Sequence, residues 1–135
     1  MTHYLLDANA LLRFFRKDIP RQAEEVAGLF VQAKQSAITI TIPLAAILET
    51  VFVLLKVYGE QKELIGSRLF AVASNPMITV ESREIVKQAL LIWKSEAISF
   101  VDCLVFAQAQ REGKELFTFD KKLKRLAKQA KKRGD

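Results

Sequence analysis

The chain has 135 residues, half of them hydrophobic, and a formal net charge of +6. This length suits one domain with a substantial buried core. The single cysteine, Cys103, excludes an internal disulfide, and the single histidine, His3, argues against a zinc site or a histidine-based catalytic triad. We expect one domain over residues 1–135 in a cytoplasmic protein with no membrane partner, because neither a secretory leader nor a membrane-spanning run is visible.

The excess positive charge lies at the end of the chain. Residues 111–135 hold ten lysines and arginines against four acids, whereas the first 110 residues carry equal numbers of both signs. A basic stripe of this kind attracts phosphate backbones without reading their sequence. The structural alternative is a solvated helix face.

Short apolar runs alternate with helical periodicities along the first half of the chain. In chain order we expect a buried strand at Tyr4–Leu6, a helix after Pro20, a strand at Ala37–Ile40, a helix from Pro43 to about Val57 that Gly59 stops, and a helix over about Glu60–Ala73.

The second half continues the alternation. We expect a strand at Ile78–Val80, a helix with its apolar stripe from Ile85 to Trp93, a helix from Ser99 to Gly113, a strand at Leu116–Thr118, and a basic helix at about 119–133. This pattern predicts an α/β fold with a short parallel sheet covered on both faces, in which ligands bind at the carboxyl ends of the strands.

Three aspartates stand at predicted helix starts. Asp7 follows the first strand, with Asn9 two residues on, and Asp120 follows the last strand, with Thr118 two residues before it. Asp102 lies three residues after Ser99, in a near match to a capping box. Helix capping competes with a functional role at each position, because Asp, Asn and Ser are preferred caps.

Glu49 is the only charged residue between Ile42 and Leu55. A helix that is apolar all round is buried, so we expect Glu49 to be buried as well. A buried carboxylate is normally paired, protonated or bound to a metal. A salt bridge to an arginine is the structural alternative, and a functional role is the interpretation we favour.

The four acids together suggest more than each alone. Gathered carboxylates repel one another unless a cation neutralises them, and oxygen ligands without paired His or Cys suit Mg²⁺ or Mn²⁺. An acidic metal pocket beside a basic stripe suggests phosphodiester hydrolysis. Cys103, next to Asp102 on an apolar face, is expected in the core.

At this point the chain resembles the PIN-domain ribonucleases, in particular the VapC-type toxins of toxin–antitoxin pairs. The matching motifs are Leu-Leu-Asp7-Ala-Asn9, Ile-Leu-Glu49-Thr, Val-Asp102-Cys-Leu-Val-Phe-Ala and Phe-Thr118-Phe-Asp120-Lys-Lys. Each motif is short, but all four occur in order over essentially the whole length. Asn9 departs from the Ser or Thr of many relatives.

The resemblance implies a PIN-like three-layer α/β/α sandwich with a short central parallel sheet. It implies a metal-dependent endoribonuclease whose Mg²⁺ or Mn²⁺ is bound by Asp7 and Asp102, with Glu49 and Asp120 completing the shell and acting on the attacking water. Asn9 and Thr118 would be supporting polar groups. It also implies an RNA substrate such as transfer or ribosomal RNA, a VapB-type antitoxin and a homodimer. From the charge tally we expect RNA contacts at Lys121, Lys122, Lys124 and Arg125.

Other interpretations stay open. A haloacid-dehalogenase-type phosphatase needs a second Asp where this chain has Asn9, and a receiver-type phospho-acceptor domain needs adjacent acids near its start. Within the PIN family, the chain could be a non-toxin RNA-processing nuclease or a silent scaffold that binds RNA or a partner.

Overall fold

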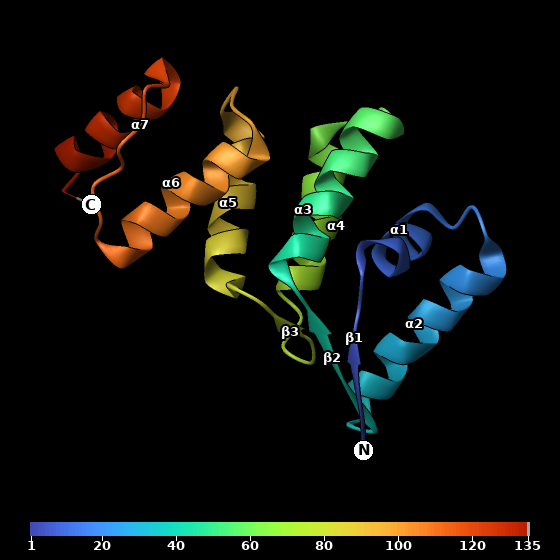
Figure 1. Ribbon diagram of the computed structural model, residues 1–135. Coiled ribbons are helices and arrows are strands. Elements are labelled where there is room, and N and C mark those ends of the chain that lie inside the picture. The colour runs from blue at the N-terminus through green and yellow to red at the C-terminus, as the bar shows by residue number, and fades with distance from the viewer. Residues whose placement is uncertain (135) are drawn as a thin grey trace. The chain divides into compact units, whose positions relative to one another are not determined.

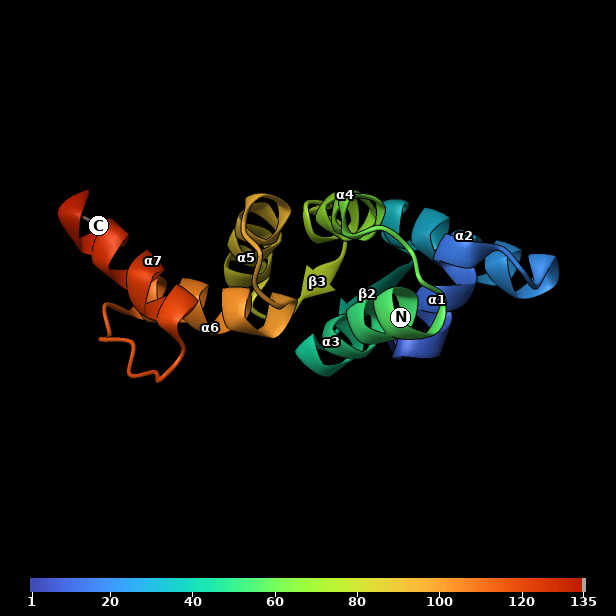
Figure 2. The ribbon, with the colours of Figure 1, turned by 90° about the horizontal axis from the view of Figure 1, so that it is seen from above.

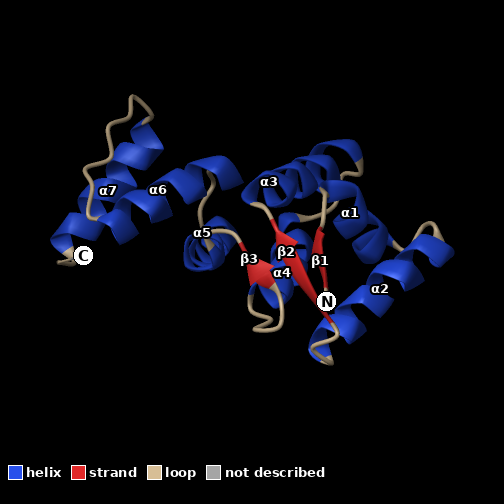
Figure 3. Ribbon diagram, turned by 60° about the horizontal axis from the view of Figure 1, so that its bottom comes forward, coloured by secondary structure: helices blue, strands red, loops and turns tan. Residues whose placement is uncertain are grey.

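The computed structural model describes residues 1–134 and divides the chain into two compact units, Met1–Arg83 and Glu84–Asp135. Unit 1 holds all three described strands, and unit 2 is made of helices (Figure 3). Among the described residues, no helix combines the length and apolar character needed to cross a membrane.

A parallel sheet organises unit 1. Its strands are β1 (Thr2–Leu5), β2 (Ile38–Ile42) and β3 (Thr79–Val80), in the order β1-β2-β3. Thr2 is opposite Ile38 in the first pair, and Thr41 is opposite Thr79 in the second. Figure 1 shows β1 and β2 side by side, each running towards the helix that follows it. The predicted parallel sheet is therefore confirmed.

The helices of unit 1 begin and end largely where the sequence predicts. They are α1 (Ala8–Arg16), α2 (Pro20–Lys34), α3 (Leu44–Phe52), the π-helical turn η1 (Val53–Val57) and α4 (Lys62–Ala73). Pro20 opens α2, because proline needs no helical N–H partner in the first turn. Gly59 follows η1 with φ of +64°, a left-handed conformation that glycine adopts at little cost.

Burial in the sheet is uneven. Ile38, Ile40 and Ile42 of β2 are buried, with the threonines between them partly exposed. All four residues of β1 are exposed, so the predicted buried strand at Tyr4–Leu6 is wrong in its burial. Only Leu6, just beyond β1, joins the core. An apolar strand is buried only where another layer covers it, and the strand's own residues do not determine that.

Unit 2 contains α5 (Arg83–Ser95, which starts on the last residue of unit 1), α6 (Phe100–Glu112) and α7 (Lys121–Lys132). Gly113 ends α6 with φ of +64°. Trp93 and Phe100 pack with ring centroids 5.5 Å apart, and Cys103 is buried in the core as predicted.

The strand predicted at Leu116–Thr118 is absent. Residues 114–118 have no regular secondary structure, and the segment forms an open connection between α6 and α7 (Figure 2). A strand needs a partner for its backbone, and none pairs with this segment within residues 1–134. The hydroxyl of Thr118 instead accepts a hydrogen bond from the Asp120 amide, a local bond that competes with extended structure.

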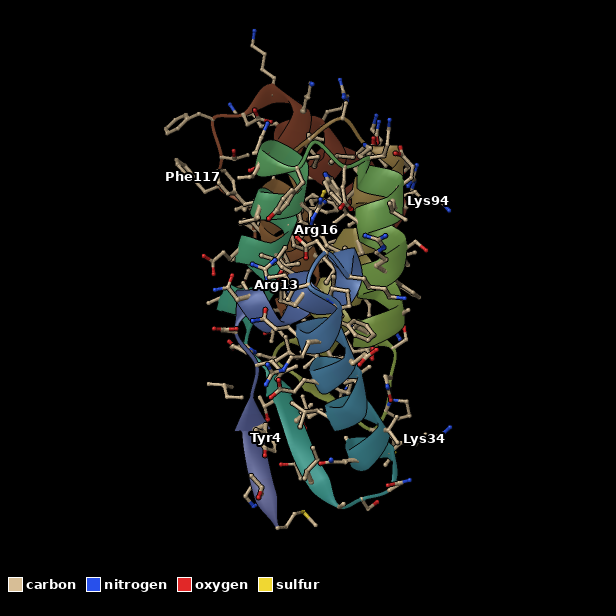
Figure 4. All side chains as sticks on the ribbon, turned by 90° about the vertical axis from the view of Figure 1, so that its right-hand side faces the viewer. Tyr4, Arg13, Arg16, Lys34, Lys94 and Phe117 are labelled. Atoms are coloured by element: carbon tan, nitrogen blue, oxygen red, sulfur yellow. The ribbon has the colours of Figure 1, made fainter. Side chains whose placement is uncertain are left out.

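The end of α1 contacts the loop after η1 through a charged cluster, which consists of Arg16, Glu60 and Arg68. Arg16 donates to Glu60 at 2.7 Å and its guanidinium lies 3.6 Å from the centre of the Tyr58 ring, while Arg68 donates to the other Glu60 oxygen at 3.0 Å. The Glu60 side chain is only 15% exposed. Figure 4 labels Arg16 and Arg13 at the end of α1. Because Glu60 is shared by two arginines, its loss leaves both guanidinium groups without that carboxylate.

We therefore predict that Glu60→Ala lowers the free energy of unfolding by about 1–3 kcal/mol in urea denaturation. Glu115→Ala is the matched control, because Glu115 pairs with Lys131 at 2.8 Å with a side chain 79% exposed, and exposed pairs contribute little. Equal stability losses in the two variants would show that the Glu60 cluster contributes no more than a surface pair.

Candidate active site

Asp7 lies at the carboxyl end of β1, where the chain turns into α1. The hydrogen bonding between β1 and β2 continues one residue past β1, because the Leu6 amide donates to the Thr41 carbonyl at 2.9 Å. Asp7 then caps α1, since its Oδ1 accepts a hydrogen bond from the Ala10 amide at 2.9 Å. Asp7 is therefore the cap, and Asn9 is an exposed residue inside α1. The second carboxylate oxygen, Oδ2, makes no hydrogen bond with any described residue.

Glu49 lies near the middle of α3, and it is exposed. The prediction of a buried Glu49 is wrong. The buried face of α3 consists of Ala46, Ile47, Thr50 and Val51, whereas Glu49 shares the exposed face with Ala45 and Phe52. The buried polar residue is its neighbour Thr50, whose hydroxyl donates to the Ala46 carbonyl at 2.7 Å. An apolar sequence therefore does not guarantee that every face of its helix is covered.

Asp102 is the third residue of α6. Ser99 caps this helix, its hydroxyl accepting from the Asp102 amide at 3.1 Å, so the predicted cap at Ser99 is confirmed. The Asp102 carboxylate is half-buried and is the acidic residue of the first turn. An acid there is stabilised by the positive end of the helix dipole.

Asp120 caps α7. Its Oδ2 accepts from the Leu123 amide at 2.9 Å, and its own amide donates to Thr118 at 3.0 Å. Thr118, two residues before Asp120 in the sequence, is thus in direct contact with it. However, Asp120 follows a loop, so the expectation that it stands at the carboxyl end of a strand is wrong. Its Oδ1, like Oδ2 of Asp7, is left without a hydrogen-bond partner among the described residues.

The structure adds one acid that the sequence analysis missed. Glu81 follows β3, and its Oε1 accepts from the Leu44 amide at 3.0 Å, which caps α3. The cap position itself is Pro43, whose side chain offers no acceptor. The sequence carried a usable indication, because Glu81 follows its strand as Asp7 follows β1. Its role here is structural.

The four predicted acids thus fall in two pairs. Asp7 and Glu49 belong to unit 1, where α1 packs against α3, and Asp102 and Asp120 belong to unit 2, where α6 contacts α7. Within residues 1–134, no group of three or more His, Cys, Asp or Glu side chains is close enough to hold a metal ion. The donor set is still of the kind that Mg²⁺ or Mn²⁺ prefers, because both capping aspartates, Asp7 and Asp120, keep one carboxylate oxygen available.

The basic residues gather on α7, as the charge tally predicts. Leu123 is its buried residue, and Lys121, Lys122, Lys124 and Arg125 are exposed. Lys122 donates to the Ala97 carbonyl at 3.0 Å, whereas Lys121, Lys124 and Arg125 form no ion pair with a described residue. The first turns of α7 therefore offer uncompensated positive charge next to Asp120.

Comparison with known proteins gives two matches. Residues 4–129 match the family model of the PIN domain. The chain is also 25% identical over 123 residues to the VapC ribonuclease of Aquifex aeolicus strain VF5, with 90% of each chain covered. No solved structure matches significantly.

The capping role of Asp120 predicts how its substitution changes the stability of the protein. Asp120→Ala removes the acceptor for the Leu123 amide, so we expect it to lower the free energy of unfolding by about 1 kcal/mol. Asp120→Asn keeps a capping oxygen and should stay within about 0.5 kcal/mol of the wild type, since Asn and Asp cap almost equally well. Urea denaturation of both variants measures this, and an Asn variant as unstable as the Ala variant would contradict it. Asn substitutions are accordingly the suitable probes of charge at Asp7 and Asp120.

Proposed function

Since the chain belongs to the PIN domain family, we propose that it is a metal-dependent endoribonuclease that hydrolyses phosphodiester bonds in RNA, acting as the VapC-type toxin of a toxin–antitoxin pair. Membership of the family also confirms the predicted PIN-like α/β fold. The observation that carries the proposal is the occurrence of all four acids, in the order of the motifs that resemble the family, within the family match of residues 4–129. The similarity to a VapC ribonuclease supports the toxin class.

We assign the metal ligands by residue type and position. Asp7 and Asp102 are the direct ligands, and Glu49 and Asp120 complete the shell and position or deprotonate the attacking water. When bound, Mg²⁺ or Mn²⁺ would polarise the phosphodiester and stabilise the leaving oxygen. Asn9 and Thr118 support this centre, and the bond from the Asp120 amide to the Thr118 hydroxyl favours such a role for Thr118.

The partners follow from the same assignment. The substrate is RNA, with transfer and ribosomal RNA as candidates, and α7 holds the backbone through Lys121, Lys122, Lys124 and Arg125. A VapB-type antitoxin would silence the enzyme, and a homodimer is the expected assembly. The second candidate function is a non-toxin RNA-processing nuclease, which would use the same four acids.

The exposure of Glu49 makes it the sharpest test of catalysis. Because its side chain lies at the surface of α3, Glu49→Gln should leave the thermal unfolding temperature unchanged while lowering Mn²⁺-dependent cleavage of total cellular RNA by about 100-fold or more. Glu24→Gln, at an exposed position on α2, is the matched control and should cleave normally. Wild-type activity in Glu49→Gln would remove Glu49 from the mechanism.

A second prediction concerns α7. Changing Lys121, Lys122, Lys124 and Arg125 together to Gln should flatten the dependence of RNA affinity on salt, by about 0.7 in log–log slope for each phosphate that the variant no longer neutralises. The control changes four other exposed cations, Arg21, Lys34, Lys56 and Lys94, to Gln. Both variants have the same net charge, so equal slopes would show that overall charge rather than α7 binds the RNA.

A further inference from the structure

The loop between α6 and α7 carries two of the most exposed apolar side chains of the protein. Phe117 and Phe119 are each 84% exposed, more than Met1 at 76%. Their rings lie edge to face, with centroids 5.4 Å apart. Figure 4 labels Phe117, whose side chain is directed away from the ribbon. Single exposed apolar residues are ordinary, but two adjacent aromatic rings held together in water indicate a surface that binds something.

The charges around the two rings indicate what is bound. Nζ of Lys124 lies 6.0 Å from the centre of the Phe119 ring, and the exposed cations Lys121 and Arg125 stand on the same first turns of α7. Of the acids nearby, Glu115 is already paired with Lys131. A purely apolar partner would leave these cations uncompensated. An anionic chain that also carries flat aromatic groups satisfies both the rings and the cations.

We propose that Phe117 and Phe119 form a stacking platform for unpaired bases of RNA, with the cations of α7 on the adjoining phosphates. This inference rests on the proposed ribonuclease function and narrows its substrate. Single strands are commonly bound by aromatic rings interleaved with basic groups, because every base has a face on which to stack. Bases inside a duplex already stack on each other, so the platform selects loops, bulges and ends.

The platform also relates binding to cleavage. Phe119 directly precedes Asp120, the acid that caps α7 and that we assign to the catalytic centre. A nucleotide stacked on Phe119 is therefore held one residue from that carboxylate. The bond that is cut would lie next to an unpaired base.

Binding without cleavage tests this directly. Fluorescence anisotropy in excess chelator would compare three fluorescein-labelled RNAs of equal length: oligouridine, an abasic ribose-phosphate chain and a duplex. We expect wild-type protein to bind oligouridine about tenfold or more tightly than the abasic chain, the size that stacking of one or two bases gives. The double variant F117A/F119A should lose that preference and keep its affinity for the abasic chain.

Two matched variants complete the experiment. F117Y/F119Y keeps the rings and should keep the preference, and Leu91→Ala, which removes an apolar side chain that is 57% exposed on α5, should change nothing. Equal binding of oligouridine and abasic chain by the wild type overturns the platform, as does an Ala variant that keeps the preference or loses affinity for both RNAs equally. If F117A/F119A instead converts a self-associated wild type into a monomer without altering base preference, the rings form a protein interface and the proposal fails. Metal-dependent cleavage of RNA is measured separately, so it tests the proposed ribonuclease function independently of the result of the binding experiment.

Discussion

The parallel sheet of unit 1 imposes the constraint that places Asp7 at the start of a helix. Parallel strands all end at the same edge, so the helices that follow them begin there, and each helix start exposes amide groups that need acceptors. Asp7 at α1 and Glu81 at α3 meet this need with carboxylates. The fold thereby gathers negative charge at one edge of the sheet, and a capping aspartate uses only one of its two oxygens.

The same principle operates in unit 2 without a sheet. Ser99 caps α6 and places Asp102 in its first turn, and Asp120 caps α7. Three of the four acids in the proposed centre are thus held by helix starts. Glu49 is the exception, because it stands in mid-helix, caps no helix and lies at an exposed position where a charged side chain is ordinary. A metal-binding role is therefore compatible with capping at Asp7 and Asp120, whereas Asp102 and Glu49 cap no helix.

Local signals in the sequence predicted most of the elements. Pro20, Gly59, Gly113 and Ser99 mark helix boundaries through backbone geometry or side-chain hydrogen bonds, which involve only near neighbours. The predictions that proved wrong depend on which other segment packs against or pairs with an element. The burial of β1, the burial of Glu49 and the strand at Leu116–Thr118 all depend on whether another segment covers or pairs with the residue. Hydrophobicity predicts that a residue favours burial, but it does not predict whether another segment of the chain buries it. The choice of the four acids needed the motif order across the whole chain, since Asp7, Asp102 and Asp120 could each act in capping and Glu49 could pair with an arginine.

The central proposal is that Asp7 and Asp102 bind a divalent metal ion, and calorimetric titration with Mn²⁺ tests it most directly. Asp7→Asn in unit 1 and Asp102→Asn in unit 2 would be titrated beside the wild type, with Asp18→Asn, an acid outside the proposed centre, as the control. The account predicts that each of the first two substitutions weakens Mn²⁺ binding by about tenfold or more, the loss typical when a metal-site group is removed, while the control binds as the wild type does. Wild-type Mn²⁺ affinity in both Asp7→Asn and Asp102→Asn would contradict the proposed metal site.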